Sequence, residues 1–167
     1  MLHAHYIKHS LNFRQPAGTS RGTLLKKDSY FIILTDSKIP GVSGIGECNI
    51  LPGLSPDDRP ELEEKLQWAC QLPSYIIDNL NILTEWPAIR FAFEMAFADL
   101  NAGGQRLLFP SAFTLGQKAI QINGLIWMGK PDYMLQQIDE KLRSGFNTIK
   151  MKIGAISFAE ELNLLRY

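Results

Sequence analysis

The sequence predicts an α+β module followed by two βα units of a parallel sheet. Two observations indicate this architecture. Three strand-like segments followed by helices occupy the first part of the chain, and strand and helix patterns alternate from about residue 118 onwards. The change of pattern predicts two domains, at 1–118 and 119–167.

In the first module, strands are predicted at 2–13, 23–35 and about 42–50, because these runs are rich in apolar and β-branched residues. The intervening segment 14–22 contains Gly and Pro and is too long for a tight hairpin, so an irregular loop is predicted there.

Two helix signals follow these strands. Ser55 precedes a proline and two acidic residues, which predicts a helix start at that point. The segment 87–101 is apolar on nearly all sides and ends before Gly103-Gly104, so it is predicted as a helix buried between two layers.

The second module has the order β-α-β-α. Strands are predicted at 120–127 and 147–153, with one helix beginning at Pro131 and another over 158–167. Two such units cannot close a parallel sheet, so this module is expected to be truncated.

The strongest chemical signal is a pair of lysines on the predicted strand 147–153. Alternation along a strand puts Ile149, Met151 and Ile153 on one face. It puts Lys150 and Lys152 on the other, and these two lysines are about 7 Å apart along the strand. Solvated lysines on an edge strand are the alternative interpretation. The pair stands at the carboxyl end of its strand, where barrel and doubly wound enzymes have their active sites. Each ammonium group disfavours the charge of the other, which favours a neutral lysine that can act as a base.

Charge and hydropathy exclude several classes of partner. The 17 basic and 17 acidic residues balance, and no long run of like charges is present, so no nucleic-acid partner is expected. No apolar stretch approaches the ~20 residues that span a membrane, and residues 1–10 do not resemble a signal peptide. A cytoplasmic location is therefore expected, with Cys48 and Cys70 as free, buried thiols.

Two motifs and the order of modules carry a family resemblance. The Lys150-Met151-Lys152 strand and the stretch Gly44-Ile45-Gly46-Glu47-Cys48 are similar to the enolase superfamily, in its muconate-lactonizing subgroup. The segments 16–22 and 123–127 most resemble the amino-terminal portion of o-succinylbenzoate synthases of the Bacteroidetes type. The resemblance implies an α+β capping domain, with a three-stranded sheet plus helices, followed by the first two βα units of a truncated (β/α)₇β TIM-like barrel.

The resemblance also implies an activity and roles for particular residues. The reaction would be the Mg²⁺-dependent syn-dehydration of 2-succinyl-6-hydroxy-2,4-cyclohexadiene-1-carboxylate to 2-succinylbenzoate, a step of menaquinone biosynthesis. Lys152 would be the acid/base and Lys150 would tune it. The capping loops would contact the small carboxylate substrate through Arg21, Thr19 and Leu51.

Some implied parts of the site fall outside this sequence. The family's metal ligands and second catalytic lysine lie on later strands, so this chain alone is expected to be inactive, with no metal ligand assigned in it. A dipeptide epimerase, an N-succinylamino acid racemase and a non-catalytic capping module stay open as alternatives. A homo-oligomer is compatible with the resemblance.

Other candidate residues are expected to be structural. The carboxylates expected to cap helices or to make structural hydrogen bonds are Asp57, Asp58, Glu94 and Asp99. Trp127 is expected in the core rather than at a ligand.

Overall fold

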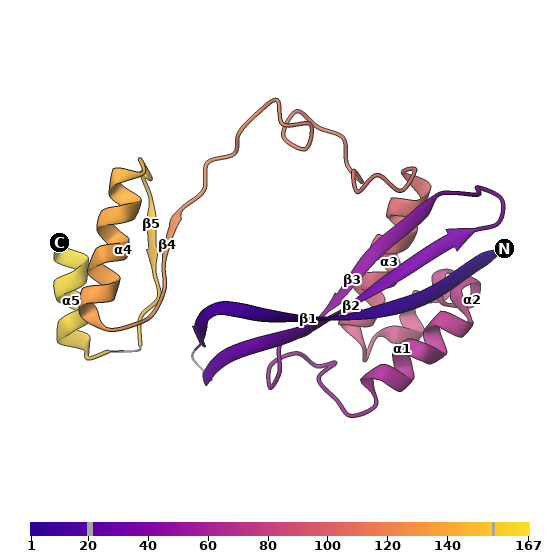
Figure 1. Ribbon diagram of the computed structural model, residues 1–167, viewed down its shortest axis with the longest axis horizontal. Helices are drawn as coiled ribbons and strands as arrows, with labels where there is room; N and C mark the ends of the chain where they lie inside the picture. The colour runs from indigo at the N-terminus through magenta and orange to yellow at the C-terminus, as the bar shows by residue number, and fades with distance from the viewer. Residues whose placement is uncertain (20–21, 155) are drawn as a thin grey trace. The chain divides into compact units, whose positions relative to one another are not determined.

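The computed structural model describes residues 1–19, 22–154 and 156–167, and it divides into two compact units. The first unit comprises Met1–Asn12 and Lys26–Leu115, and the second comprises Phe13–Leu25 and Gly116–Tyr167. Figure 1 traces the elements along the chain. Within the described ranges, none of the helices has the length and apolar character needed to cross a membrane. The domain boundary at 118 stays a prediction.

Three strands form the first sheet, in the order β1 (Leu2–Thr19), β2 (Gly22–Asp36) and β3 (Ser43–Asn49). β2 pairs with β3 in the antiparallel direction, with Tyr30 opposite Cys48. The three predicted strands are confirmed, but the prediction of an irregular loop over 14–22 is wrong, because β1 continues to Thr19 and β2 begins at Gly22. Pro16 is tolerated because β1 lies at the edge of the sheet, where a missing N–H need not cost a ladder bond.

The helices of the first unit pack on this sheet (Figure 1). They are α1 (Leu62–Gln71), α2 (Pro73–Asp78), the short 3₁₀ helix η1 (Leu80–Leu83) and α3 (Pro87–Asn101). The prediction for 87–101 is confirmed at both ends, and Gly103 and Gly104 follow α3 with positive φ angles of 88° and 70°. One face of α3 is buried, but Phe91 is 54% exposed, so the expected burial on all sides is wrong.

The predicted helix start at Ser55 is also wrong, because α1 begins only at Leu62. The Ser55 and Asp57 side chains, which predicted that start, make hydrogen bonds to other segments. Ser55 Oγ accepts a hydrogen bond from the Leu51 N–H at 2.9 Å. The buried Asp57 caps α3 instead of a local helix: its Oδ1 accepts from the Ala88 and Ile89 N–H groups at 3.0 and 3.2 Å.

The two glycines of the Gly44–Cys48 stretch allow α3 to lie directly against β3. A Cβ atom at Gly44 would lie 1.9 Å from the Ala96 carbonyl oxygen, and one at Gly46 would lie 1.9 Å from that of Ala92. No side chain fits in that space, so this motif serves helix–sheet packing.

A buried carboxylate on α3 joins the end of the helix to the sheet. Asp99 accepts hydrogen bonds from the backbone N–H of Ile45 at 2.9 Å and of Arg106 at 2.7 Å, and it pairs with the Arg106 guanidinium. Burial alone would raise the pKa of Asp99, but these donors outweigh it and hold the pKa below its ordinary value.

The second unit contains a parallel strand pair and two helices: β4 (Gly124–Ile126), α4 (Pro131–Arg143), β5 (Ile149–Met151) and α5 (Phe158–Arg166). β4 pairs with β5, with Ile126 opposite Met151, so the β-α-β-α prediction is confirmed. The strands are shorter than the predicted 120–127 and 147–153, because in the described residues each strand has one partner and the pairing covers three residues. A small separate core contains Ile126, Met134, Ile138 and Leu164.

Candidate active site

The lysine pair lies at the carboxyl end of β5. Lys150 stands on β5 opposite Leu125 and is exposed, whereas Ile149 and Met151 pack against the small core. The predicted alternation of faces is therefore confirmed over β5. Lys152 follows one residue after the strand and is half-buried. The alternation does not extend to Ile153, which is 62% exposed, because the strand has already ended.

Trp127 is the neighbour of Lys152. It follows directly after β4, and the Lys152 Nζ lies 5.2 Å from the centroid of its indole ring. That separation is within the range of a cation–π contact. The expectation of a core position is wrong: Trp127 is 42% exposed, because β4 ends at Ile126 and the tryptophan lies outside the paired strand.

A buried glutamine on α4 holds the backbone of Trp127. Gln137 is 7% exposed, and its Oε1 accepts from the Trp127 N–H at 2.9 Å while its Nε2 donates to the Trp127 carbonyl at 3.1 Å. Sequence reasoning missed this residue. A signal was present, because Gln137 interrupts the apolar stripe that contains Met134 and Ile138.

A buried glutamate on α5 makes the equivalent contact after β5. Glu161 is 6% exposed and accepts a hydrogen bond from the backbone N–H of Gly154, two residues after Lys152. Gly154 has a φ of 100°, a backbone conformation that glycine adopts most readily. Sequence reasoning missed Glu161 too, although it lies three residues before the buried Leu164 on the inner side of α5.

A cavity in the second unit includes Trp127. Its volume is about 560 Å³, and it is lined by residues 13–18 together with Trp127, Met128 and Tyr133. The Tyr133 hydroxyl donates to Gln15 Oε1 at 3.4 Å across this cavity. A volume of this size fits a small-molecule ligand.

Three predicted substrate contacts are not tested by this geometry. Arg21 lies outside the described residues, and the side chain of Thr19, the last residue of β1, is not described either. Leu51 belongs to the first unit, where its carbonyl accepts from Leu54 and Ser55, both at 3.0 Å. Its role in substrate binding stays a prediction.

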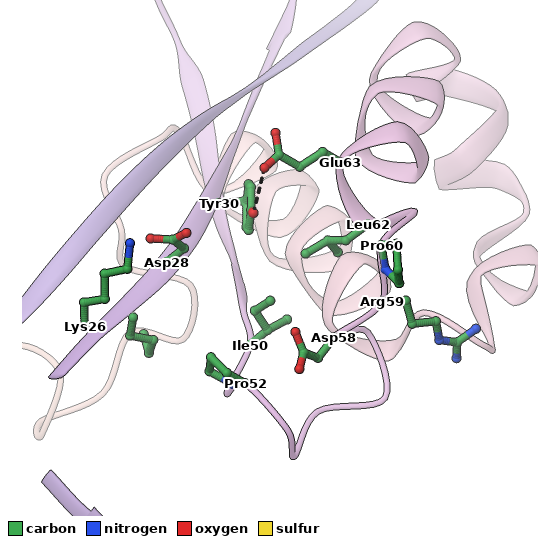
Figure 2. Close-up of a pocket in the computed structure, with 11 residues that line it drawn as sticks. Lys26, Asp28, Tyr30, Ile50, Pro52, Asp58, Arg59, Pro60, Leu62 and Glu63 are labelled. Atoms are coloured by element: carbon green, nitrogen blue, oxygen red, sulfur yellow. Dashed lines mark hydrogen bonds between the residues drawn. The ribbon is translucent and has the colours of Figure 1, made fainter. Parts of the chain in front are cut away.

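The first unit has a smaller cavity of about 230 Å³, shown in Figure 2. Tyr30 donates to Glu63 Oε1 at 3.1 Å, drawn as a dashed line, and the Lys8 ammonium group binds the same oxygen at 2.7 Å. The hydrogen bond from Lys8 lowers the pKa of Glu63. Asp28 lies 3.4 Å from the same ammonium group. These charges are paired with one another, which indicates a structural cluster rather than a catalytic one.

Both cysteines are free thiols, as predicted, but Cys70 is only half-buried. Burial, with Asp57 and Glu47 nearby, raises the pKa of Cys48 to about 12, and burial raises that of Cys70 to about 11. Thiols held protonated in this way are poor nucleophiles.

The four carboxylates predicted to be structural have such partners. Asp58 accepts from the Gly53 N–H at 2.6 Å, and Glu94 pairs with Arg90 at 2.9 Å, while Asp57 and Asp99 hold backbone N–H groups. Across the described part of the chain, no group of three or more His, Cys, Asp or Glu side chains is placed to hold a metal ion. The described residues therefore do not fit a magnesium site.

Comparison with known proteins agrees with this architecture. No family model matches the chain. The o-succinylbenzoate synthase of Desulfotalea psychrophila (strain LSv54 / DSM 12343) is 38% identical over 192 aligned positions, which cover 96% of this chain and 51% of that protein. The chain thus spans about half the length of this curated relative.

Solved structures match over nearly the whole chain. The crystal structure of MenC from Desulfotalea psychrophila LSv54 has a TM-score of 0.73 and 31% identity, with 99% of this chain and 52% of that chain covered. A dipeptide epimerase from Enterococcus faecalis V583, complexed with Mg and the dipeptide L-Leu-L-Tyr, has a TM-score of 0.69 and 21% identity, with 98% and 48% covered. This second likeness shows the fold alone.

Proposed function

Because this chain belongs to the enolase superfamily and is similar to the amino-terminal half of an o-succinylbenzoate synthase, we propose that it supplies the capping domain and the lysine pair of such an enzyme. The complete enzyme would convert 2-succinyl-6-hydroxy-2,4-cyclohexadiene-1-carboxylate to 2-succinylbenzoate and water. The observation that carries the proposal is the place of Lys152, one residue past the carboxyl end of β5 with its ammonium group against Trp127. Chemistry in barrel enzymes takes place at that end of the strands.

Lys152 has the role of the base. In its neutral form, Nζ takes the proton alpha to the substrate carboxylate, and the electron pair of that C–H bond forms the new double bond as the C–O bond breaks. The leaving hydroxide takes the proton back from the Lys152 ammonium group and departs as water, which restores the neutral lysine. The exposed Lys150 acts on Lys152 through its like charge. The complete enzyme would also depend on Mg²⁺, for which the described residues of this chain offer no ligand set.

The cavity beside Trp127 supports a small carboxylate as the substrate. Its volume of about 560 Å³ is suited to a single ring with short substituents, and Met128 and Tyr133 add apolar and hydroxyl-bearing surface to it. Substrate contacts by Thr19, Arg21 and Leu51 are proposed from the family resemblance alone. A cytoplasmic location also stays a proposal.

A chimera tests this function. Residues 1–167 are joined to the carboxyl-terminal half of the Desulfotalea relative, which supplies a complete barrel, and formation of 2-succinylbenzoate is followed in the presence of Mg²⁺. The chimera should form 2-succinylbenzoate, and the 167-residue chain alone should not. The intact Desulfotalea enzyme is the positive control. A chimera that folds, shown by circular dichroism, and yet makes no product would contradict the proposal.

Two of the three alternatives have distinct outcomes. A dipeptide epimerase would exchange the hydrogen at the alpha carbon of its substrate, so incubation of the chimera in D₂O with L-Leu-L-Tyr, the dipeptide of the Enterococcus faecalis structure, separates the two activities. Deuterium incorporation without any formation of 2-succinylbenzoate would favour an epimerase. A non-catalytic module is tested by the coding region downstream of Tyr167, where a continuing frame with further strand and helix patterns supports the enzyme.

A further inference from the structure

We propose that Gln137 and Glu161 are positioning residues that hold the Trp127–Lys152 pair in place from the two helices that follow the strands. This inference rests on the proposed function, because it assigns these residues to the lysine that acts as the base. Each residue is buried, each comes from the helix after the strand it serves, and each binds the backbone just beyond that strand's carboxyl end. The same device therefore occurs once in each βα unit.

Gln137 holds Trp127 by both of its backbone groups, the N–H and the carbonyl. The carboxamide accepts the Trp127 N–H at 2.9 Å and donates to the Trp127 carbonyl at 3.1 Å, and its Nε2 also donates to the Tyr133 carbonyl at 3.3 Å. Because both backbone groups of Trp127 are engaged, the residue is held although the strand pairing ends at Ile126. The Tyr133 contact ties the amide to its own helix, so that the helix sets the position of the tryptophan.

Glu161 fixes the segment that follows Lys152. Its Oε1 accepts the Gly154 N–H, and the residue is only 6% exposed. Burying a carboxylate costs free energy unless it is hydrogen-bonded, and the hydrogen bond from Gly154 offsets part of that cost. Lys152 stands between this anchor and the last paired residue, Met151, which limits the positions that its side chain can reach.

The geometry of the pair depends on both anchors. Trp127 and Lys152 each lie one residue past a paired strand, and neither belongs to the strand ladder. The separation of 5.2 Å between ring centroid and Nζ is therefore set by backbone segments that Gln137 and Glu161 hold. A misplacement of about 1 Å at a reacting group costs up to ~10²-fold in rate, so anchors of this kind have catalytic consequences.

The first test uses the 167-residue chain and needs no activity. Backbone hydrogen exchange is measured in Gln137→Met and Glu161→Met. Gln137→Met should speed the exchange of the Trp127 amide at least about tenfold, and Glu161→Met should speed that of the Gly154 amide by a similar factor. The Gly124 amide, which donates to the Thr148 carbonyl at 2.9 Å, should keep its wild-type rate and is the internal control against general unfolding. Equal rates at Trp127 and Gly154 in variant and wild type overturn the proposal, and so does an absence of protection there in the wild type.

The second test uses turnover of the chimera. Gln137→Met and Glu161→Met should each lower kcat about 10- to 100-fold with KM changed less than about threefold, because the loss concerns the placement of the base. Glu161→Gln keeps an oxygen that accepts the Gly154 N–H and should restore kcat to within about threefold of wild type. Gln136→Met, at the exposed neighbouring position on α4, is the matched control and should leave both constants unchanged.

The outcomes separate this inference from the proposed function. An inactive wild-type chimera refutes the function, while the exchange pattern still decides whether the anchors hold Trp127 and Gly154. A wild-type kcat in both Met variants, with exchange accelerated as expected, shows a purely structural role and overturns the positioning role. Failure of Glu161→Gln to recover activity overturns it as well.

Discussion

Substitution of Gly46 by alanine tests the packing of α3 on β3. The added methyl group would lie 1.9 Å from the Ala92 carbonyl oxygen and 2.8 Å from the Ala96 nitrogen. To restore an ordinary contact of 3.4 Å, α3 would have to retreat by about 1.5 Å. The obstructing atoms belong to the backbone of a helix that is capped by Asp57 and packed on the core, so they cannot move aside as a side-chain tip would.

The expected cost is at the upper end of the range for overpacking, about 3 kcal/mol or more. That is a large part of the ~5–15 kcal/mol that keeps a typical domain folded. With the usual dependence on urea of ~1–3 kcal/mol per molar, the unfolding midpoint should fall by about 1–3 M.

Tryptophan fluorescence during urea unfolding is the assay. Trp68 and Trp86 report on the first unit, and a Trp127→Phe background removes the signal of the second. The matched control is Gly18→Ala, because a Cβ there meets no atom within 4 Å and the change should stay within about 0.5 kcal/mol. A Gly46→Ala midpoint equal to wild type would refute the close approach of α3 to β3.

Two further predictions concern buried carboxylates of the first unit. Asp57→Ala should lower the free energy of unfolding by about 1–2 kcal/mol, because the Ala88 and Ile89 N–H groups lose their acceptor. Asp57→Asn should lower it less, because the amide keeps an acceptor oxygen. Thermal unfolding compares both variants with the wild type, and equal melting temperatures for the three proteins would exclude the cap. The pKa of Asp99 is lowered in the folded state, so its contribution is present above the ordinary aspartate pKa of about 4 and is lost as the pH falls through the lower folded value. The urea concentration at the unfolding midpoint should therefore fall as the pH is lowered below about 4, and it should fall less steeply in Asp99→Asn. The same dependence on pH in the variant and the wild type would contradict this.

Much of the fold follows from local patterns in the sequence. The helix Pro87–Asn101 is bounded by a proline at its start and glycines after its end, and both signals act within a few residues. The parallel order of β4 and β5 follows from the intervening helix, because a crossover of that length permits it. The face on which Lys150 stands follows from strand alternation alone.

The errors arise where a distant partner overrides a local signal. Ser55 and Asp57 have the residue types of a local helix start, but they bind the Leu51 and α3 backbone instead, and no pattern within the segment reveals those partners. The predicted loop at 14–22 contains proline and glycine, yet β1 extends to Thr19, because an edge strand tolerates a proline that lacks an N–H. The core position predicted for Trp127 assumes that it belongs to the strand, whereas β4 ends at Ile126 and leaves the tryptophan exposed.

The candidate site is predictable only in part. The lysine pair could be found from its spacing and from its place before Gly154. The anchors Gln137 and Glu161 could not be assigned, because a polar residue on an apolar stripe indicates burial but does not identify what it binds.

Turnover of the chimera with Lys152→Ala tests the central claim most directly. If Lys152 is the base, this variant should lose nearly all formation of 2-succinylbenzoate while its circular dichroism and unfolding midpoint match those of the parent chimera, because the side chain is half-buried and lies outside the small core. A folded Lys152→Ala chimera that keeps more than about a tenth of the parent rate would show that another group removes the proton.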